Sequence, residues 1–196
     1  MKSLKTLVVV DMQKDFIDGV LGTPEAQAIE PKVAEFIKGW NGKVVFTMDT
    51  HHRVKPEDNP NLQRYCDLVE GQKVPIHCEK YTPGWCFGDA IMDALNDVCE
   101  RTEYSIIYKR TFMDRSIASD VCTMHNCGFG ADTPQEIVIV GLCTDICVIS
   151  NALYLRSVFP DIPIKVMANL CAGTTPKNHE AALKVMKACC IEIVED

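Results

Sequence analysis

The sequence has no cluster of basic residues and no apolar run long enough to cross a membrane. Its 20 basic and 27 acidic residues give a net charge of −7, so the chain offers no positive patch to a nucleic acid or an anionic membrane surface. The first residues lead straight into a strand pattern instead of an apolar, signal-type stretch. We therefore expect a cytoplasmic protein whose partner is a small molecule.

A Cys-x-x-Cys pair is also missing, although the chain contains eleven cysteines. An odd number of scattered cysteines does not indicate a disulfide framework, and a chain of 196 residues can bury a core without covalent staples. We expect reduced thiols that mostly fill the core. Because no linker, internal repeat or low-complexity segment interrupts the sequence, residues 1–196 are predicted to form a single domain.

Short apolar runs alternate with amphipathic segments along the chain. The predicted strands are residues 6–10, 43–50, 104–108, 137–140, 163–168 and 191–194. The predicted helices are residues 27–40 (with Pro31 in the first turn), 88–100 (with Ile91, Met92, Leu95 and Val98 on one face), 117–126, 144–155 and 176–189. Strands that alternate with helices predict an α/β fold, a three-layer α/β/α sandwich on a mostly parallel sheet of about six strands.

The predicted strand at residues 137–140 leads into a potential nucleophile. Gly141 is expected to end this strand, and Thr144 and Asp145 are residue types that cap helices. Cys147 then lies in the first turn of a helix, where free N–H groups and the helix dipole favour a thiolate, whereas Cys143 precedes the helix. Taken alone, however, Cys147 is better explained as one of eleven cysteines that fill the core.

Four further functional side chains lie at the carboxyl ends of predicted strands: Asp11, Asp49, His51 and Lys109. Each alone is ordinary, because strand-end carboxylates often cap loops and strand-end lysines are usually solvated. Parallel strands, however, end at one edge of the sheet, and open α/β sheets bind their ligands at that edge. We therefore expect these residues and Cys147 to lie together.

Asp49 and His51 are the start of a potential metal site. Period-two alternation directs them to the same side of the strand and sends His52 to the other side. Two ligands are weak support for a metal, so a third must come from elsewhere, and the candidates are His77 and Glu70. Mixed nitrogen and oxygen ligands suit one divalent ion such as zinc, iron or manganese, with positions left open for water or substrate.

Several segments together resemble a known family. They are Asp-Met-Gln-x-Asp-Phe, Asp-x-His, Pro-x-His-Cys, Lys-Arg-x-Phe, Gly-Leu-Cys-Thr-Asp-Ile-Cys-Val and the closing Cys-Ala-Gly-Thr-Thr-Pro-Lys-Asn-His-Glu-Ala-Ala-Leu. This pattern is similar to that of the nicotinamidases among the isochorismatase-like cysteine hydrolases, over most of the chain. The resemblance implies a metal-dependent amidase that converts nicotinamide to nicotinic acid and ammonia through a thioester, in NAD salvage.

The resemblance also implies catalytic roles. Cys147 would be the nucleophile, and Asp11 would be the general base and acid. Lys109 would keep Asp11 ionised and favour the thiolate. The backbone N–H groups of Cys143 and Cys147 would receive the oxyanion, with a cis peptide bond between Leu142 and Cys143.

The same resemblance implies the metal ligands Asp49, His51 and His77, and Glu70 matches a fourth ligand seen in some members. Zinc is the favoured ion, with iron or manganese as alternatives. In nicotinamidases the ion coordinates the pyridine nitrogen and so positions the ring for attack.

Phe16 and Phe112 resemble the walls that sandwich the substrate ring. Val74 departs from the family because many nicotinamidases have an aromatic residue at this position. This exchange predicts more room beside the ring, and therefore hydrolysis of pyrazinamide and ring-substituted nicotinamides. The segment 113–116 departs as well, from a run of small residues, with an effect that the sequence does not predict.

Two other classes of function remain open. A related amidase acting on another carboxamide or carbamoyl compound would need the triad without the metal ligands, and it ranks second because all three metal ligands are present. A non-catalytic binding protein on this fold ranks third, since such a protein is expected to lack at least one of Asp11, Lys109 and Cys147. A homo-oligomer is compatible with either function.

Overall fold

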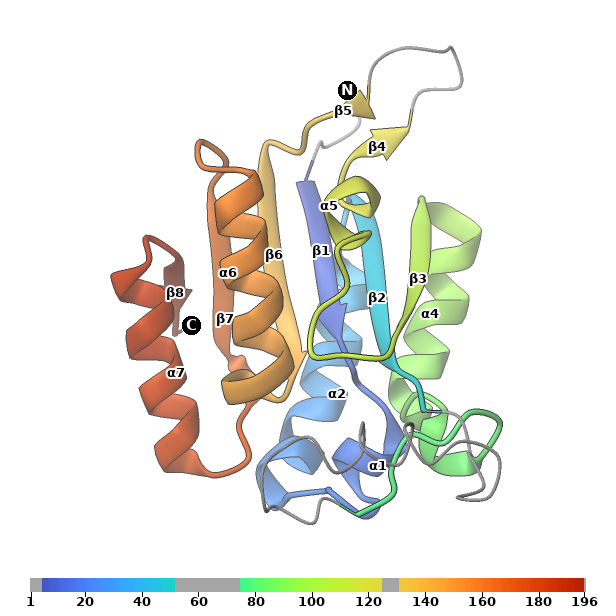
Figure 1. Ribbon diagram of the computed structural model, residues 1–196. Helices are drawn as coiled ribbons and strands as arrows, with labels where there is room; N and C mark the ends of the chain where they lie inside the picture. Colours follow the sequence, from blue (N-terminus) through green and yellow to red (C-terminus); the bar gives the residue numbers. More distant parts are fainter. Residues whose placement is uncertain (1–4, 52–74, 125–130, 196) are drawn as a thin grey trace, which may run out of the picture.

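A six-stranded parallel sheet forms the centre of the computed structural model, which describes residues 5–51, 75–124 and 131–195 (Figure 1). The strands lie in the order β3-β2-β1-β6-β7-β8, and every neighbouring pair is parallel. They are β1 (Lys5–Val10), β2 (Lys43–Asp49), β3 (Tyr104–Lys109), β6 (Glu136–Leu142), β7 (Ile164–Ala172) and β8 (Glu192–Val194). A separate antiparallel pair consists of β4 (Thr123–Met124) and β5 (Ala131–Asp132). The predicted α/β class is confirmed.

Helices cover both faces of this sheet. They are α1 (Lys14–Ile17), α2 (Pro24–Gly39), α4 (Asp89–Arg101), α5 (Ile117–Asp120), α6 (Ile149–Val158) and α7 (Pro176–Ala188), with a 3-10 turn η1 (Pro83–Trp85) and a π-helical turn η2 (Thr144–Val148). In Figure 1, α6 and α7 lie in front of the sheet, and α2 and α4 lie behind it. These are the three layers that the sequence predicts.

Strand β1 shows why a central strand of the sheet is apolar on both of its faces. Leu7 and Val9 pack into the cluster that includes α2 and α4, while Val8 and Val10 pack into the cluster that includes α6 and α7. All four are fully buried. Removal of each such side chain from water stabilises the fold by about 1.5–3 kcal/mol. A continuous apolar run is therefore the sequence signature of a strand covered on both sides.

The strand order reverses between β1 and β6. From β1 the chain moves outward through β2 to β3, then returns to β6 on the other side of β1 and continues outward to β8. Connections on the two sides of this point leave in opposite directions, so a crevice opens at the carboxyl ends of β1 and β6. Ligands of open α/β sheets bind at such a switch point.

Gly141 lets β1 and β6 approach closely at this point. Its φ angle of +117° is one that side-chain-bearing residues rarely adopt, and a Cβ atom here would lie 2.1 Å from the carbonyl oxygen of Val10. The sequence predicts that Gly141 ends the strand. This was wrong, because β6 continues to Leu142 and Gly141 remains within it.

Several element boundaries differ from the prediction. Helix α2 begins at Pro24 instead of residue 27, because the Thr23 side chain caps it by accepting from the Ala26 N–H at 3.0 Å and Pro24 suits the first helical position. Pro31 therefore lies inside the helix, not in its first turn. Because proline has no N–H, the carbonyl of Gln27 lacks its usual hydrogen bond within the helix. Gln27 is an exposed residue.

Two further differences concern buried faces and strand length. Met92 was predicted on the apolar face of α4, but it is 37% exposed, and Ala94 completes that face instead. Strand β7 was predicted to end at Ala168, but a register shift relative to β6 lets Cys171 and Ala172 pair with Gly141 and Leu142.

The predicted helix at 117–126 is limited to α5, which ends at Asp120 before β4 begins. Within the described parts of the chain, no helix combines the length and apolar character needed to cross a membrane.

Candidate active site

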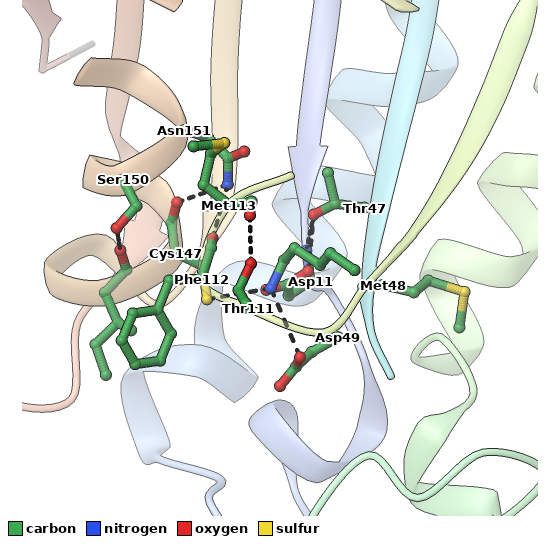
Figure 2. Close-up of polar contacts among 12 residues, drawn as sticks. Asp11, Thr47, Met48, Asp49, Thr111, Phe112, Met113, Cys147, Ser150 and Asn151 are labelled. Carbon is green, nitrogen blue, oxygen red and sulfur yellow. Dashed lines mark hydrogen bonds and ion pairs between the residues drawn. The ribbon is translucent and has the colours of Figure 1, made fainter. Parts of the chain in front are cut away.

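Three side chains meet at the carboxyl edge of the sheet. Asp11 follows β1, Lys109 is the last residue of β3, and Cys147 lies in η2 directly after β6. The Lys109 ammonium lies 2.6 Å from Asp11 Oδ2 and donates to Cys147 Sγ at 3.3 Å. Figure 2 shows Asp11 and Cys147 directed toward each other. The structure thus brings together the three residues predicted as a catalytic triad, and their roles in catalysis remain predictions.

Lys109 is a buried cation surrounded by acidic groups. Burial alone would lower its pKa, but its acidic neighbours, first Asp11 and then Cys147 and Asp49, outweigh burial and raise it. The Asp49 carboxylate is part of this set, since its Oδ1 lies 3.9 Å from the Lys109 ammonium. Lys109 is therefore charged throughout the neutral pH range.

Asp11 is held by its backbone and by a hydroxyl group. Its φ angle is +45°, in the left-handed region, so the chain turns sharply at the end of β1. The Thr47 hydroxyl donates to Asp11 Oδ1 at 2.7 Å. Burial raises the pKa of Asp11, and the Lys109 charge opposes this without cancelling it. Asp11 is thus a carboxylate of increased basicity, which suits a proton acceptor.

Cys147 differs from the sequence prediction in its charge. A position at a helix N-terminus predicts a thiolate, but burial and the neighbouring Asp11 charge raise the pKa of Cys147, and Lys109 only partly opposes them. The resting group is a thiol with a carboxylate and an ammonium beside it. A nucleophilic sulfur at Cys147 would therefore require a base, and the Asp11 carboxylate is the adjacent basic group.

The turn that carries Cys147 was predicted as an α-helix capped by Thr144 or Asp145. It is a π-helical turn with Cys143 at its N-cap, and neither side chain caps it. Thr144 Oγ1 instead makes a 2.8 Å hydrogen bond with His179 Nδ1. Asp145 accepts from the backbone N–H and the hydroxyl of Thr174. Both side chains therefore tie the turn to the start of α7.

The peptide bond between Leu142 and Cys143 is cis, as the resemblance implies. Burial, then Asp145 and Asp11, raise the pKa of the Cys143 thiol to about 12, and Lys109 opposes them only in part.

Three possible metal ligands lie beside the group formed by Asp11, Lys109 and Cys147. Asp49 Oδ2 is 3.0 Å from His51 Nε2 and 3.3 Å from His77 Nε2, and one ligand atom of each residue lies within 4.8 Å of the others. The backbone of His51 accepts from Lys80 N–H and donates to the Cys78 carbonyl. This pairing brings His51 next to His77, which precedes Cys78.

The protonation of His77 tests whether these residues fit a metal ion. Its Nδ1 lies 2.8 Å from the Pro75 carbonyl, which can only accept, so Nδ1 carries the proton. Nε2 then presents its lone pair to the Asp49 carboxylate, and two acceptors in contact require a positive species between them. A proton on Nε2 satisfies this. Burial would lower the pKa of His77, but the hydrogen bonds with Asp49 and Pro75 outweigh burial and raise it. A divalent ion satisfies it equally, with three nitrogen and oxygen ligands and open positions.

Comparison with known proteins identifies the family. The isochorismatase domain family matches residues 5–195. The chain belongs to the isochorismatase family. A nicotinamidase of Saccharomyces cerevisiae is 25% identical over 178 residues, which cover 76% of this chain and 80% of that protein.

Solved structures of a nicotinamidase/pyrazinamidase and of a pyrazinamidase have the same fold. The nicotinamidase/pyrazinamidase of Bacillus subtilis is 22% identical, with a TM-score of 0.74 and complete coverage of both chains. The pyrazinamidase of Pyrococcus horikoshii, solved in complex with zinc, is 25% identical, with a TM-score of 0.67 and coverage of 98% of this chain and 99% of that one. The resemblance inferred from the sequence motifs is thus confirmed.

The two aromatic residues predicted as substrate walls differ in burial in this isochorismatase fold. Phe16 is buried, and its ring centroid lies 5.5 Å from that of His77, so it borders the possible metal site. Phe112 is 51% exposed, and its carbonyl accepts from Asn151 Nδ2 at 3.2 Å. Val74 and the fourth possible ligand Glu70 lie outside the described residues, as does His52.

Thr47 and Asn151 belong to the site but were missed in the sequence. Thr47 lies two residues before Asp49, so the alternation that pairs Asp49 with His51 could also have included it. Asn151 follows Cys147 by one helical turn and donates to its carbonyl at 2.8 Å. Its second contact, with Phe112, depends on the tertiary fold (Figure 2). No pattern in the sequence marks that contact.

Proposed function

We propose that this protein is a metal-dependent cysteine amidase that hydrolyses nicotinamide to nicotinic acid and ammonia. The coarser statement, an amidohydrolase of the isochorismatase family, has the support of relatives named nicotinamidase and pyrazinamidase. The finer one rests on the chemistry of the described residues. The product, nicotinic acid, is a precursor for NAD salvage, and cytoplasmic location and oligomeric state remain predictions from the sequence.

One observation carries the proposal: the Lys109 ammonium lies within 4 Å of a thiol and two carboxylates, at 3.3 Å from Cys147 Sγ, 2.6 Å from Asp11 and 3.9 Å from Asp49. The first two contacts make a nucleophile with its base. The third joins this pair to the possible metal ligands. A substrate whose ring is anchored at Asp49, His51 and His77 would therefore have its carboxamide next to an activatable thiol.

In the first half of the reaction, Asp11 takes the proton of the Cys147 thiol as sulfur attacks the carboxamide carbon. The new carbon–sulfur bond gives a tetrahedral intermediate with a negative oxygen. Asp11 then transfers its proton to the amide nitrogen, the carbon–nitrogen bond breaks and ammonia leaves. A thioester on Cys147 remains. Lys109 stays charged throughout and stabilises whichever of its partners carries the negative charge.

In the second half, Asp11 takes a proton from a water molecule as the oxygen of that water attacks the thioester carbon. The second tetrahedral intermediate collapses with cleavage of the carbon–sulfur bond, and the proton on Asp11 returns to Cys147. Nicotinic acid is released. In both halves we assign the oxyanion to the backbone N–H groups of Cys143 and Cys147, next to the cis peptide bond.

Asp49, His51 and His77 would hold one divalent metal ion, with zinc favoured because a similar pyrazinamidase was solved in complex with zinc. When bound, the ion would supply a Lewis-acidic position for the pyridine nitrogen, which orients the ring. Phe16 would pack against the ring, and Phe112 would cover it from the solvent side.

Ammonia release tests this function directly. Purified protein loaded with zinc should release ammonia from nicotinamide, and much less from aliphatic amides such as acetamide and from ureido compounds. Release from the aliphatic panel at equal or greater efficiency would instead favour the related amidase, the second-ranked function. Absence of turnover on every amide, with correctly folded and metal-loaded protein, would favour a binding protein.

A further inference from the structure

The carboxamide of Gln13 holds the backbone of Asp49 at two points. Gln13 Oε1 accepts from the Asp49 N–H at 2.8 Å, and Nε2 donates to the Asp49 carbonyl at 2.9 Å. The second N–H of the same amide donates to the Trp85 carbonyl at 2.7 Å. The side chain is fully buried. Each of its N–H groups and its carbonyl oxygen therefore has a backbone partner.

Strand pairing explains why Asp49 needs these contacts. Parallel pairing of β1 with β2 extends to Val10 and Thr47, and Asp11 N–H still donates to the Thr47 carbonyl at 3.2 Å. The chain then turns away at Asp11, so β1 supplies no further residue. In a strand, Asp49 presents its N–H and carbonyl to the same side as Thr47 does, because these positions differ by two.

Without another partner, two buried backbone groups of Asp49 would be left unpaired. A carboxamide carries a carbonyl and an N–H in the arrangement of a peptide group. Gln13 thus takes the place of the strand residue that β1 no longer provides.

The residue held in this way is the one that joins the two parts of the site. Asp49 Oδ2 faces His51 and His77, and Oδ1 faces the Lys109 ammonium. We propose that Gln13 is a positioning residue of the metal site, which fixes the Asp49 carboxylate so that it meets both imidazoles around a divalent cation. This inference rests on the metal role proposed above, and it adds a residue that does not itself ligate the ion.

The chemistry at this position is specific for an amide. Gln13→Met preserves the length and apolar packing of the side chain but has no hydrogen-bonding group. Gln13→Glu retains an acceptor for the Asp49 N–H, but it places an oxygen against two carbonyl oxygens, those of Asp49 and Trp85. Both variants should therefore release the Asp49 backbone.

The experiment measures zinc affinity by competition with a chromophoric chelator, on protein first stripped of metal. We expect Gln13→Met and Gln13→Glu to bind Zn²⁺ about 10- to 100-fold more weakly than the wild type, the usual effect of removing a partner of a metal ligand. Thr6→Val is the matched control. It removes the buried 2.8 Å hydrogen bond from Thr6 to the Val121 carbonyl at the opposite end of β1, and should keep the wild-type affinity.

Thermal unfolding of the metal-free proteins accompanies the titration, since each variant loses buried hydrogen bonds. Wild-type zinc affinity in a folded Gln13→Met protein would overturn the proposal. Equal loss of affinity in Thr6→Val would overturn it as well, because general destabilisation would then be the cause. Failure of both Gln13 variants to fold would assign Gln13 to the framework and not to the metal site. No substrate is used, so the result stands apart from whether nicotinamide is hydrolysed.

Discussion

A single buried ammonium, that of Lys109, balances the acidic groups of the site. Burial disfavours the charged forms of Asp11 and Lys109, and their contact at 2.6 Å helps to outweigh this for Lys109 but offsets it only in part for Asp11. The same ammonium opposes the effects of burial and of Asp11, which raise the pKa of the Cys147 thiol. In the proposed mechanism, Lys109 would therefore lower the free energy of whichever neighbour is anionic as the proton moves between sulfur and carboxylate.

Replacement of Lys109 tests this electrostatic role. In Lys109→Met, the cation that lowers the pKa of Cys147 is gone, so this pKa rises further and the pH profile for alkylation by iodoacetamide shifts to higher pH. Amidase turnover should fall by about 100-fold or more. Lys43→Met is the control, because Lys43 is also buried but binds Glu103 and the Cys122 carbonyl at the start of β2. An unchanged alkylation profile in Lys109→Met would remove Lys109 from the site.

The two cysteines of the turn can be separated by mutation. Cys147→Ala removes the sulfur that contacts Lys109 and should reduce amide hydrolysis by at least ~1,000-fold. Cys143→Ala should retain a substantial fraction, because it leaves the proposed nucleophile Cys147 and its contact with Lys109 in place. Rates of ammonia release from both variants decide the matter. The assignment is wrong if Cys143→Ala is inactive while Cys147→Ala turns over.

At the scale of elements, the close contact of β1 with β6 places Asp11 near the turn that carries Cys147. Gly141 permits this contact by a backbone conformation that excludes side chains. Gly141→Ala should lower the free energy of unfolding by at least ~3 kcal/mol, since a Cβ atom would meet the Val10 carbonyl and φ would be strained. Urea denaturation measures the change.

Gly39→Ala provides the control for this substitution. Gly39 is the last residue of α2, and a Cβ atom there would meet nothing within 4 Å. The same chemical change should therefore leave stability unaltered or raise it by about 0.5–1 kcal/mol. Equal destabilisation by the two substitutions would contradict the packing argument at Gly141.

The sequence predicted the elements well where a single pattern determined them. Apolar runs located all six strands of the central sheet, and the signal is strongest in β1, β2 and β6, which are buried on both faces. Predictions failed where a tertiary contact competed with a local preference. Thr144 and Asp145 are good capping residues, yet their side chains bind His179 and Thr174 of another segment. Local propensity does not contain that alternative.

The site shows the same division. Asp11, Lys109 and Cys147 could be assigned to one edge of the sheet, since each follows a strand. The protonation of Cys147 could not be predicted, because it depends on how deeply the turn is buried and on the distance to Asp11. The two hydrogen bonds between the Gln13 carboxamide and the Asp49 backbone could not be predicted either, because they form only where β1 turns away from β2.

At the scale of the whole molecule, the reversal of strand order assembles the site from two halves. The possible metal ligands come from the end of β2 and the segment at Pro75 to Cys78, and the proposed nucleophile comes from the turn after β6. Asp11, between them in the sheet, and Lys109 link the halves. This separation means that binding of the substrate ring and activation of the thiol should be affected independently.

Metal removal tests that independence. Asp49, His51 and His77 offer oxygen and nitrogen ligands without a thiolate, so a strong chelator should strip the ion, more readily at acid pH where the imidazoles gain protons. The Michaelis constant for nicotinamide should then rise markedly, whereas alkylation of Cys147 by iodoacetamide, which has no pyridine nitrogen to anchor, should slow much less. Restoring zinc should reverse the first effect. If metal-free protein hydrolysed nicotinamide with an unchanged Michaelis constant, the ring would not be anchored at this half of the site, and an amidase acting on another carboxamide would become the better interpretation.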